Sequence, residues 1–204
     1  MVIGPDGGNG MDKIYHQTID ALVAAAGERD STAQGHSERV RTYAAAIADK
    51  LESMSEQDLK NLGYAASLHD IGKVAISERI LNKLGRLTEE EFAIMRQHSI
   101  VATRILEKVD GLHDAIPFIR HHHERYDGDG YPDGLAGEDI PLGARIVAVA
   151  EAYDILTSDV PWRNAMSANE ALKEVKRCSG TQFDPKVVVA LESALSDISN
   201  ETSS

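Results

Sequence analysis

The chain has 204 residues, of which 42% are hydrophobic, and its formal net charge is −12. This length and apolar content suffice for one sizeable hydrophobic core. The negative charge argues against a protein that coats DNA, RNA or an anionic membrane, because such binding depends on clustered lysine and arginine. A small anionic substrate stays open, since a bound metal ion could supply local positive charge.

Both ends of the chain differ in composition from its middle. Residues 1–11 are rich in glycine and residues 196–204 are polar, so we expect a flexible N-terminal segment and a polar C-terminal tail around one domain over residues 12–195. The single cysteine, Cys178, excludes an internal disulfide. Neither a membrane-spanning apolar run nor a signal-peptide pattern is present, so we expect a cytoplasmic protein with no membrane span.

Apolar residues recur at helical spacing through most of the domain, and alternating strand patterns are scarce, which predicts an all-α fold. The first helix is predicted over residues 12–26. The next has an apolar stripe that begins one turn after His36 and consists of Val40, Ala44, Ile47 and Leu51. Ser55 and Asp58 then predict a helix N-cap, and the helix that they open leads to His69 and, one turn later, Lys73.

Three later segments also place chemically active side chains on or beside apolar faces. Thr88 and Glu91 form a capping box that opens the first of these segments. The second ends in two adjacent histidines, and the third is a helix that follows a glycine-rich loop over residues 127–140. The side chains concerned are His98, His122, His123 and Glu151.

Five histidines and two carboxylates thus occupy inward or nearly inward positions. They are His36, His69, Asp70, His98, His122, His123 and Glu151. Any single histidine of this kind could be an ordinary hydrogen-bonded core residue. Burial of the whole set without partners would cost several kcal/mol, and metal ions would satisfy the set together. Because no thiolate belongs to it, the set favours iron, manganese or zinc in an open hydrolytic site.

Five stretches of the sequence resemble one known family. They are ERDSTAQGHSERV, LHDIGKVAI, LTEEEFAIMRQHS, HHERYDGDGYPDGLAGEDIPLGARIVAVAEAYDILTSD and GTQFDP. Together they resemble the HD-GYP domain, a branch of the HD phosphohydrolase superfamily, and the resemblance covers about residues 28–191. The resemblance implies an HD-domain helical bundle with a long loop that carries Gly130, Tyr131 and Pro132. It also implies a bacterial phosphodiesterase that hydrolyses cyclic di-GMP to pGpG and, in some members, onward to GMP.

The resemblance further implies a role for individual residues. The seven histidines and carboxylates would bind two divalent metal ions, iron or manganese with zinc as the alternative, and Asp70 would bridge them. Asp70 and Lys73 would form the catalytic pair, with Lys73 on the scissile phosphate. Tyr131, Asp154 and Arg163 would hold the substrate, although Asp154 could equally pair locally beside Arg163. The loop with Tyr131 would also contact partner proteins such as diguanylate cyclase domains.

Three features depart from the family pattern. Glu151 stands where members carry Asp, and its extra methylene displaces the carboxylate by about an ångström or more. Thr32 stands where some members carry a Glu that binds a third ion, so we expect two ions. Val160 and Trp162 replace an Arg and a Tyr, and the missing Arg removes a substrate contact worth about 1.5–3 kcal/mol.

Two other functions stay open. The first is another HD phosphohydrolase activity, on a different cyclic dinucleotide or a nucleotide monoester. The second is a weakly active or inactive scaffold that binds cyclic di-GMP or a cyclase. The intact histidines favour an enzyme, whereas Glu151 and Val160 leave the scaffold open.

Overall fold

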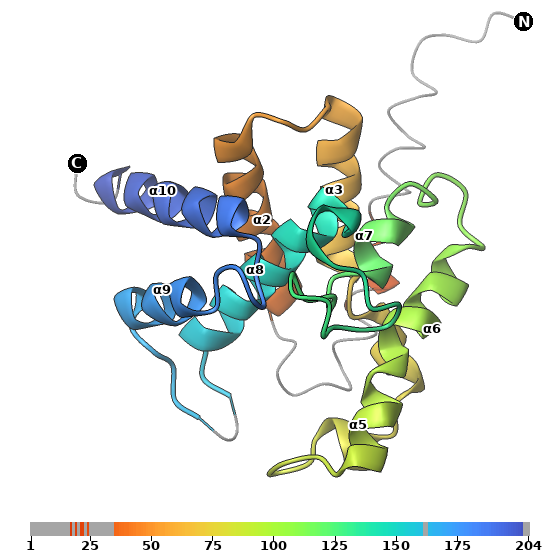
Figure 1. The fold of residues 1–204 in the computed structure, drawn as a ribbon. Helices are drawn as coiled ribbons and strands as arrows, with labels where there is room; N and C mark the ends of the chain where they lie inside the picture. Colours follow the sequence, from red (N-terminus) through yellow and green to blue (C-terminus); the bar gives the residue numbers. More distant parts are fainter. Residues whose placement is uncertain are drawn as a thin grey trace, which may run out of the picture.

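The structure is a computed structural model that describes residues 17, 19, 21, 22, 24, 35–160 and 163–201 (Figure 1). This part of the chain is helical, as the sequence predicts, and contains no β-strand. The elements are α2 (His36–Leu51), α3 (Glu56–Leu68), the 3₁₀ helix η1 (Ile71–Ala75), α4 (Glu78–Leu81), α5 (Glu89–Met95), α6 (Gln97–Leu106), α7 (Ile116–Arg120), the 3₁₀ helix η2 (Gly137–Asp139), α8 (Leu142–Thr157), α9 (Ala168–Arg177) and α10 (Pro185–Glu201).

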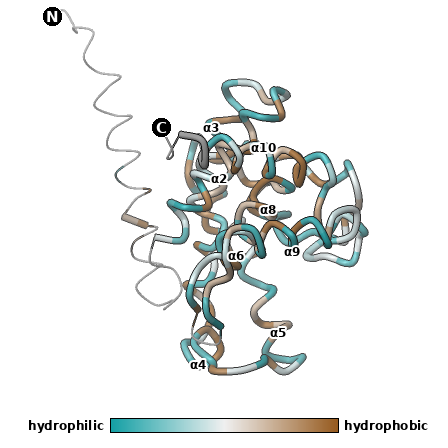
Figure 2. Tube along the Cα trace, turned by 90° about the vertical axis from the view of Figure 1, so that its left-hand side faces the viewer, coloured by the Kyte–Doolittle hydropathy of each residue, from teal (hydrophilic) through white to brown (hydrophobic). Residues whose placement is uncertain are grey.

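Helix α8 is the centre of the fold. It packs against α2, α3, α7, α9 and α10, and Figure 1 shows it between them. A helix with so many neighbours must be apolar around most of its circumference. Its buried residues are Gly143, Ala144, Ile146, Val147, Val149, Ala150, Glu151, Tyr153 and Asp154. In Figure 2 the apolar stretches gather around α8 in the middle of the molecule. Two carboxylates buried in such a helix require specific partners.

Two predicted capping boxes are confirmed, at the starts of α3 and α5. In the first, Ser55 Oγ accepts from the backbone N–H of Asp58, whose carboxylate accepts in return from the N–H of Ser55. Thr88 and Glu91 make the same reciprocal pair. The helix expected from Thr88 onward is divided at Arg96, where ψ is −21° and the backbone is closer to 3₁₀ than to α geometry.

Several metal-ligand candidates that the sequence places at the ends of helices lie just beyond the observed helix ends. Helix α3 ends at Leu68, so His69 and Asp70 lie in the turn before η1. His122 and His123 likewise follow the end of α7. The helical pattern therefore placed these residues on the correct face but continued the helix too far.

The chain ends agree only in part with expectation. Among residues 12–26, the described positions 17, 19, 21, 22 and 24 are helical, and Ile19 is buried in the core; the rest of this predicted helix, and residues 1–11, lie outside the described residues. The expected polar tail is helical to Glu201, because α10 continues through its first six residues. Across the described helices, none combines the length and apolar content that crossing a membrane requires.

Candidate metal centre and substrate cavity

The structure brings all seven predicted ligands together in two neighbouring clusters. The first consists of His36, His69, Asp70 and Glu151, and the second of His98, His122 and His123. Within each cluster, the atoms that could bind a metal lie within 4.8 Å of one another. The first joins the start of α2, the turn after α3 and the interior of α8, and the second joins α6 to the turn after α7. Each cluster has the residue types and spacing of a site for one divalent cation.

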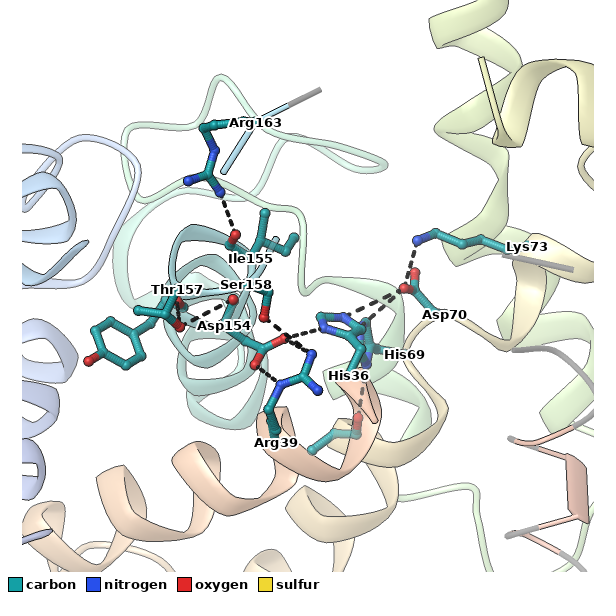
Figure 3. A network of polar contacts seen from close by, with 12 residues as sticks. His36, Arg39, His69, Asp70, Lys73, Asp154, Ile155, Thr157, Ser158 and Arg163 are labelled. Carbon is teal, nitrogen blue, oxygen red and sulfur yellow. Dashed lines mark hydrogen bonds and ion pairs between the residues drawn. The ribbon is translucent and has the colours of Figure 1, made fainter. Parts of the chain in front are cut away.

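Asp70 lies between the two clusters, and Figure 3 shows its contacts with His36 and His69 of the first. Its Oδ2 is 3.4 Å from His69 Nε2 and 4.0 Å from His36 Nε2, both in the first cluster. Its Oδ1 is 3.7 Å from Nε2 of His98, in the second. One carboxylate therefore presents an oxygen to each cluster, the arrangement needed to bridge two cations.

Within the part of the chain that the structure describes, two buried atoms of this centre lack a hydrogen-bond partner. They are His69 Nε2 and Asp70 Oδ1, and each faces a neighbouring ligand candidate instead. Leaving a buried polar atom unsatisfied costs about 1–3 kcal/mol. A divalent cation in each cluster would satisfy both atoms, so the residues present fit the two metal ions that the sequence predicts.

Three of the histidines are oriented by the backbone of their own segment. The Nδ1–H groups of His69, His98 and His122 donate to the carbonyl oxygens three residues earlier, at 2.9, 2.8 and 2.6 Å. A hydrogen bond of this kind fixes the tautomer and leaves the Nε2 lone pair available to a metal. His36 is held differently, because its Nδ1 lies 2.7 Å from the carboxylate of Asp154 on α8.

The electrostatics of the second cluster favour neutral histidines. Burial, reinforced by the neighbouring imidazoles, lowers the pKa of His122 well below its ordinary value. Burial likewise lowers the pKa of His98, and that of His123 to about 4. Neutral imidazole is the form that binds metals, so this cluster is ready to do so near neutral pH.

The carboxylates of the first cluster are ionised. Burial would raise the pKa of Asp70, but Lys73 and His69 outweigh it and hold that pKa well below the ordinary value. Burial would also raise the pKa of Glu151, and His123 and His69 lower it on balance. Burial would lower the pKa of His69, but the carboxylates of Asp70 and Glu151 outweigh it and raise that pKa to about 9. A cation in this cluster would replace that proton.

Glu151 reaches the first cluster despite its extra methylene. It projects from the interior of α8, is 8% exposed, and lies within ligand distance of His36, His69 and Asp70. The substitution of Glu for Asp therefore leaves the set of possible ligands complete. Thr32, the position that bears on a third ion, lies outside the described residues.

A cavity of about 400 Å³ opens over both clusters. One part of its wall is polar and carries metal-ligand candidates together with Lys73, whose Nζ is 2.7 Å from Asp70 Oδ2. Another part is apolar and consists of Leu81, Phe92, Met95, Ile155 and Val160. A ligand with an anionic centre and aromatic or apolar ends would match both kinds of wall.

Tyr131 covers the edge of the second cluster. Its ring lies 4.9 Å from that of His123 at an interplanar angle of 30°, and it also lines the cavity. Burial raises the pKa of its phenol, which therefore stays protonated and can donate a hydrogen bond. The expected position of Tyr131 at the substrate pocket is in this respect consistent with the geometry.

The loop that presents Tyr131 is folded tightly against the turn after α7. A Cβ on Gly130 would lie 2.2 Å from the Arg125 backbone nitrogen, so only glycine fits there. The buried carboxylate of Glu124 accepts hydrogen bonds from the N–H groups of Asp133, at 2.6 Å, and Gly134. The loop is thereby fixed to the residues that carry His122 and His123.

Two predicted substrate residues are engaged elsewhere. Arg163 does not line the cavity; its guanidinium donates to the carbonyl oxygens of Ile155 and Leu156 near the end of α8 (Figure 3). Asp154 does line the cavity, but it contacts His36 and Arg39 rather than Arg163. The alternative of a local pairing between Asp154 and Arg163 is therefore not seen, because the two side chains have different partners.

Sequence reasoning missed Arg39 and Phe92, which both line the cavity. Arg39 follows His36 by three residues and so lies on the same face of α2. Phe92 precedes Met95 by three residues on α5, and its ring carries the Arg96 guanidinium 4.3 Å from the ring centroid. The helical spacing from His36 was a signal that could have identified Arg39, whereas the sequence offered no predicted site residue three or four positions from Phe92.

The protein is therefore a helical domain built around a candidate metal centre, which consists of two clusters beside one cavity. The model of the HD domain family matches residues 21–187, so the chain belongs to the HD domain family. This match, with the relatives that follow, confirms the resemblance to the HD-GYP branch of that superfamily.

Curated relatives are similar over most of this chain. A cyclic di-GMP phosphodiesterase of Thermotoga maritima is 39% identical over 187 residues, which are 89% of this chain and 50% of the relative. The cyclic di-GMP phosphodiesterase response regulator RpfG of Xanthomonas campestris is 38% identical, covering 90% and 49%. The 3'3'-cGAMP-specific phosphodiesterase 3 of Vibrio cholerae is 36% identical, covering 90% and 40%. The chain thus spans about half the length of these relatives or less.

Solved structures confirm the HD-domain helical fold. A cyclic GMP-AMP specific phosphodiesterase of V. cholerae, V-cGAP3, superposes with a TM-score of 0.68 at 21% identity, covering 87% of this chain and 48% of the other. Bd1817, described as an HDG"Y"P protein from Bdellovibrio bacteriovorus, gives 0.66 at 21% identity, covering 89% and 63%. At these identities the likeness establishes the fold alone.

Proposed function

We propose that this chain is a metal-dependent phosphodiesterase that hydrolyses cyclic di-GMP to pGpG, with GMP as the product of a second cleavage. The observation that carries this proposal is the position of Asp70, which directs one oxygen toward each cluster and pairs with Lys73 of the cavity wall. The names of the T. maritima and X. campestris relatives support the substrate. A cytoplasmic location stays a prediction.

In this proposal the seven clustered residues hold two divalent ions, iron or manganese, with zinc as the alternative. Such ions supply Lewis-acid polarisation of a phosphoryl oxygen and activation of a water molecule. The ammonium of Lys73 lies beside Asp70 on the cavity wall and would stabilise negative charge on the phosphoryl oxygens. The buried Asp70 carboxylate keeps this ammonium directed at the centre.

The apolar wall of the cavity suits the nucleobases. The Phe92 ring forms part of this wall, has Arg96 against one face and meets the Tyr131 ring edge to face at 6.3 Å. Aromatic rings supported in this way are stacking surfaces for bases. We therefore assign Phe92 and Tyr131 to base binding and Lys73 to the phosphate, while a substrate role for Arg163 stays a prediction.

Replacing Phe92 by Ala is expected to raise KM for cyclic di-GMP roughly tenfold or more, because the stacking surface for one base is lost. Hydrolysis of bis(p-nitrophenyl) phosphate, which has no purine, should change less than about threefold. Ile94→Ala is the matched control, since Ile94 lies on the same helix, is 46% exposed and does not line the cavity. If F92A had the wild-type KM for cyclic di-GMP, Phe92 would not be a base-binding residue.

A second candidate substrate is 3'3'-cGAMP. Val160 presents an apolar surface to the cavity where the family pattern has an Arg, which favours a changed preference among cyclic dinucleotides. The V. cholerae relative is named as specific for 3'3'-cGAMP. A scaffold that binds cyclic di-GMP or a diguanylate cyclase, the latter through the loop with Tyr131, is the alternative outside catalysis.

Elemental analysis and product detection test the proposed function together. Purified protein loaded with iron, manganese or zinc should contain about two ions per chain and release pGpG from cyclic di-GMP. The same samples incubated with 3'3'-cGAMP rank the two substrates by kcat/KM. If protein that contains two ions bound cyclic di-GMP tightly but released no product, the proposed enzyme function would be wrong and the scaffold function would stand in its place.

A further inference from the structure

Asp154 forms a buried connection between α8 and α2. Its Oδ2 lies 2.7 Å from His36 Nδ1, and its Oδ1 accepts from Arg39 Nε at 2.6 Å, with a second bond from Arg39 Nη2 at 3.1 Å (Figure 3). The Asp154 side chain is only 1% exposed. Among the described residues, the close polar contacts of this carboxylate are thus all with one histidine and one arginine of α2, which leaves little of it for a ligand in the cavity.

His36 needs such a partner because of its place in the helix. The other three oriented histidines follow or lie within helical turns and use the carbonyl oxygen three residues earlier. His36 is the first residue of α2, and Gly35 before it has left-handed backbone angles, with φ of 70°. Because α2 begins at His36, the helix has no earlier turn whose carbonyl oxygen could accept from Nδ1–H, and a side chain from α8 accepts instead.

We propose that Asp154 is a positioning residue for His36. The Asp154 carboxylate fixes the tautomer of the His36 imidazole so that Nε2 faces the first cluster, and Arg39 holds this carboxylate in place. The inference rests on the metal centre of the proposed function and differs from a substrate role for Asp154. A carboxylate behind a histidine also makes that histidine a stronger ligand, and removal of such a partner lowers metal affinity about 10- to 100-fold.

Asp154→Asn tests this assignment, with Asp184→Asn as a matched control. Both aspartates are almost fully buried and paired with an arginine, but Asp184 contacts Arg145, at 2.5 Å, and none of the described histidines. Metal-free protein is titrated with Mn²⁺ and Zn²⁺ against a chromophoric chelator. We expect D154N to lose about 10- to 100-fold in affinity for one of two ions. D184N should lower the melting temperature but keep both affinities.

The KM for cyclic di-GMP at saturating metal separates positioning from substrate binding. A positioning role predicts a KM within about twofold of wild type once both ions are bound. If D154N bound both ions with wild-type affinity but had a strongly raised KM, the inference would be overturned and Asp154 would be a substrate-binding residue. A wild-type chain that binds no ions would overturn the proposed function and this inference with it.

Arg39→Gln is a second variant in case D154N fails to fold. The Arg39 side chain is 42% exposed, so its replacement is tolerated more easily than a change in the core. Since the carboxylate would lose its anchor but remain near His36, we expect a several-fold loss of affinity for the same ion. An R39Q chain with wild-type affinity for both ions would also overturn the inference.

Discussion

Asp70→Asn is expected to lower kcat for cyclic di-GMP by about 1,000-fold or more. The two oxygens of Asp70 serve different clusters, so the amide can present only one acceptor where two are needed. The ionised carboxylate also pairs with Lys73, and its loss would leave that ammonium without its 2.7 Å partner. Loss of several kcal/mol of transition-state stabilisation corresponds to a factor of this size.

The measurement pairs kcat with metal content. D70N should fold but contain fewer than two ions per chain, and added metal should not restore its kcat. Asp184→Asn is again the control, because it removes a buried charge next to Arg145, outside both clusters. If D70N kept two ions and more than about a tenth of the wild-type kcat, Asp70 would not be the bridging residue.

The membership of the candidate site could be predicted from the sequence because its members fall on apolar helical faces. His36 and Glu151 are far apart in the chain, yet each lies on the side of its helix that faces the core, and the packing of α2 on α8 brings them together. Any polar residue on such a face has to meet others of its kind or remain unsatisfied. The all-α fold was predictable for a different reason, the recurrence of apolar residues at helical spacing.

Which partner each side chain meets was less predictable. His36 and Asp154 are 118 residues apart, and no periodicity within α2 or α8 indicates that they touch. The sequence therefore suggested Arg163 as a neighbour of Asp154, whereas the structure uses Arg163 to bind backbone carbonyl groups near the end of α8. Contacts between distant helices depend on rotation and rise, which the spacing of apolar residues does not determine.

Helix ends were also difficult to predict, and the metal centre is made largely of them. His69, Asp70, His122 and His123 continue apolar stripes but lie in the turns that follow α3 and α7. An apolar stripe records which side of a segment is buried, and a turn after a helix can bury the same side. Ligands in these turns approach the centre from several directions, which residues within one straight helix cannot do.

Gly72→Ala is expected to damage both stability and the second cluster. A Cβ at this position would lie 1.9 Å from the carbonyl oxygen of His98 and 2.7 Å from the backbone nitrogen of Ala102. Both contacts are with backbone, so η1 would have to move away from α6, at a cost of about 1–3 kcal/mol. That movement would also separate Asp70 from His98, which are 3.7 Å apart.

Gly63→Ala is the control for this substitution, since it lies in α3 and a Cβ there meets no atom within 4 Å. It should stabilise the protein by about 0.5–1 kcal/mol, because alanine favours a helix over glycine. Thermal unfolding separates the variants, since each kcal/mol shifts the melting temperature by about 2–4 °C in a chain of this size. G72A should melt lower and bind fewer than two ions, whereas G63A should melt higher and bind both. Equal melting temperatures and metal contents would mean that η1 can leave α6 at no cost, and that the close contact at Gly72 does not hold the two clusters together.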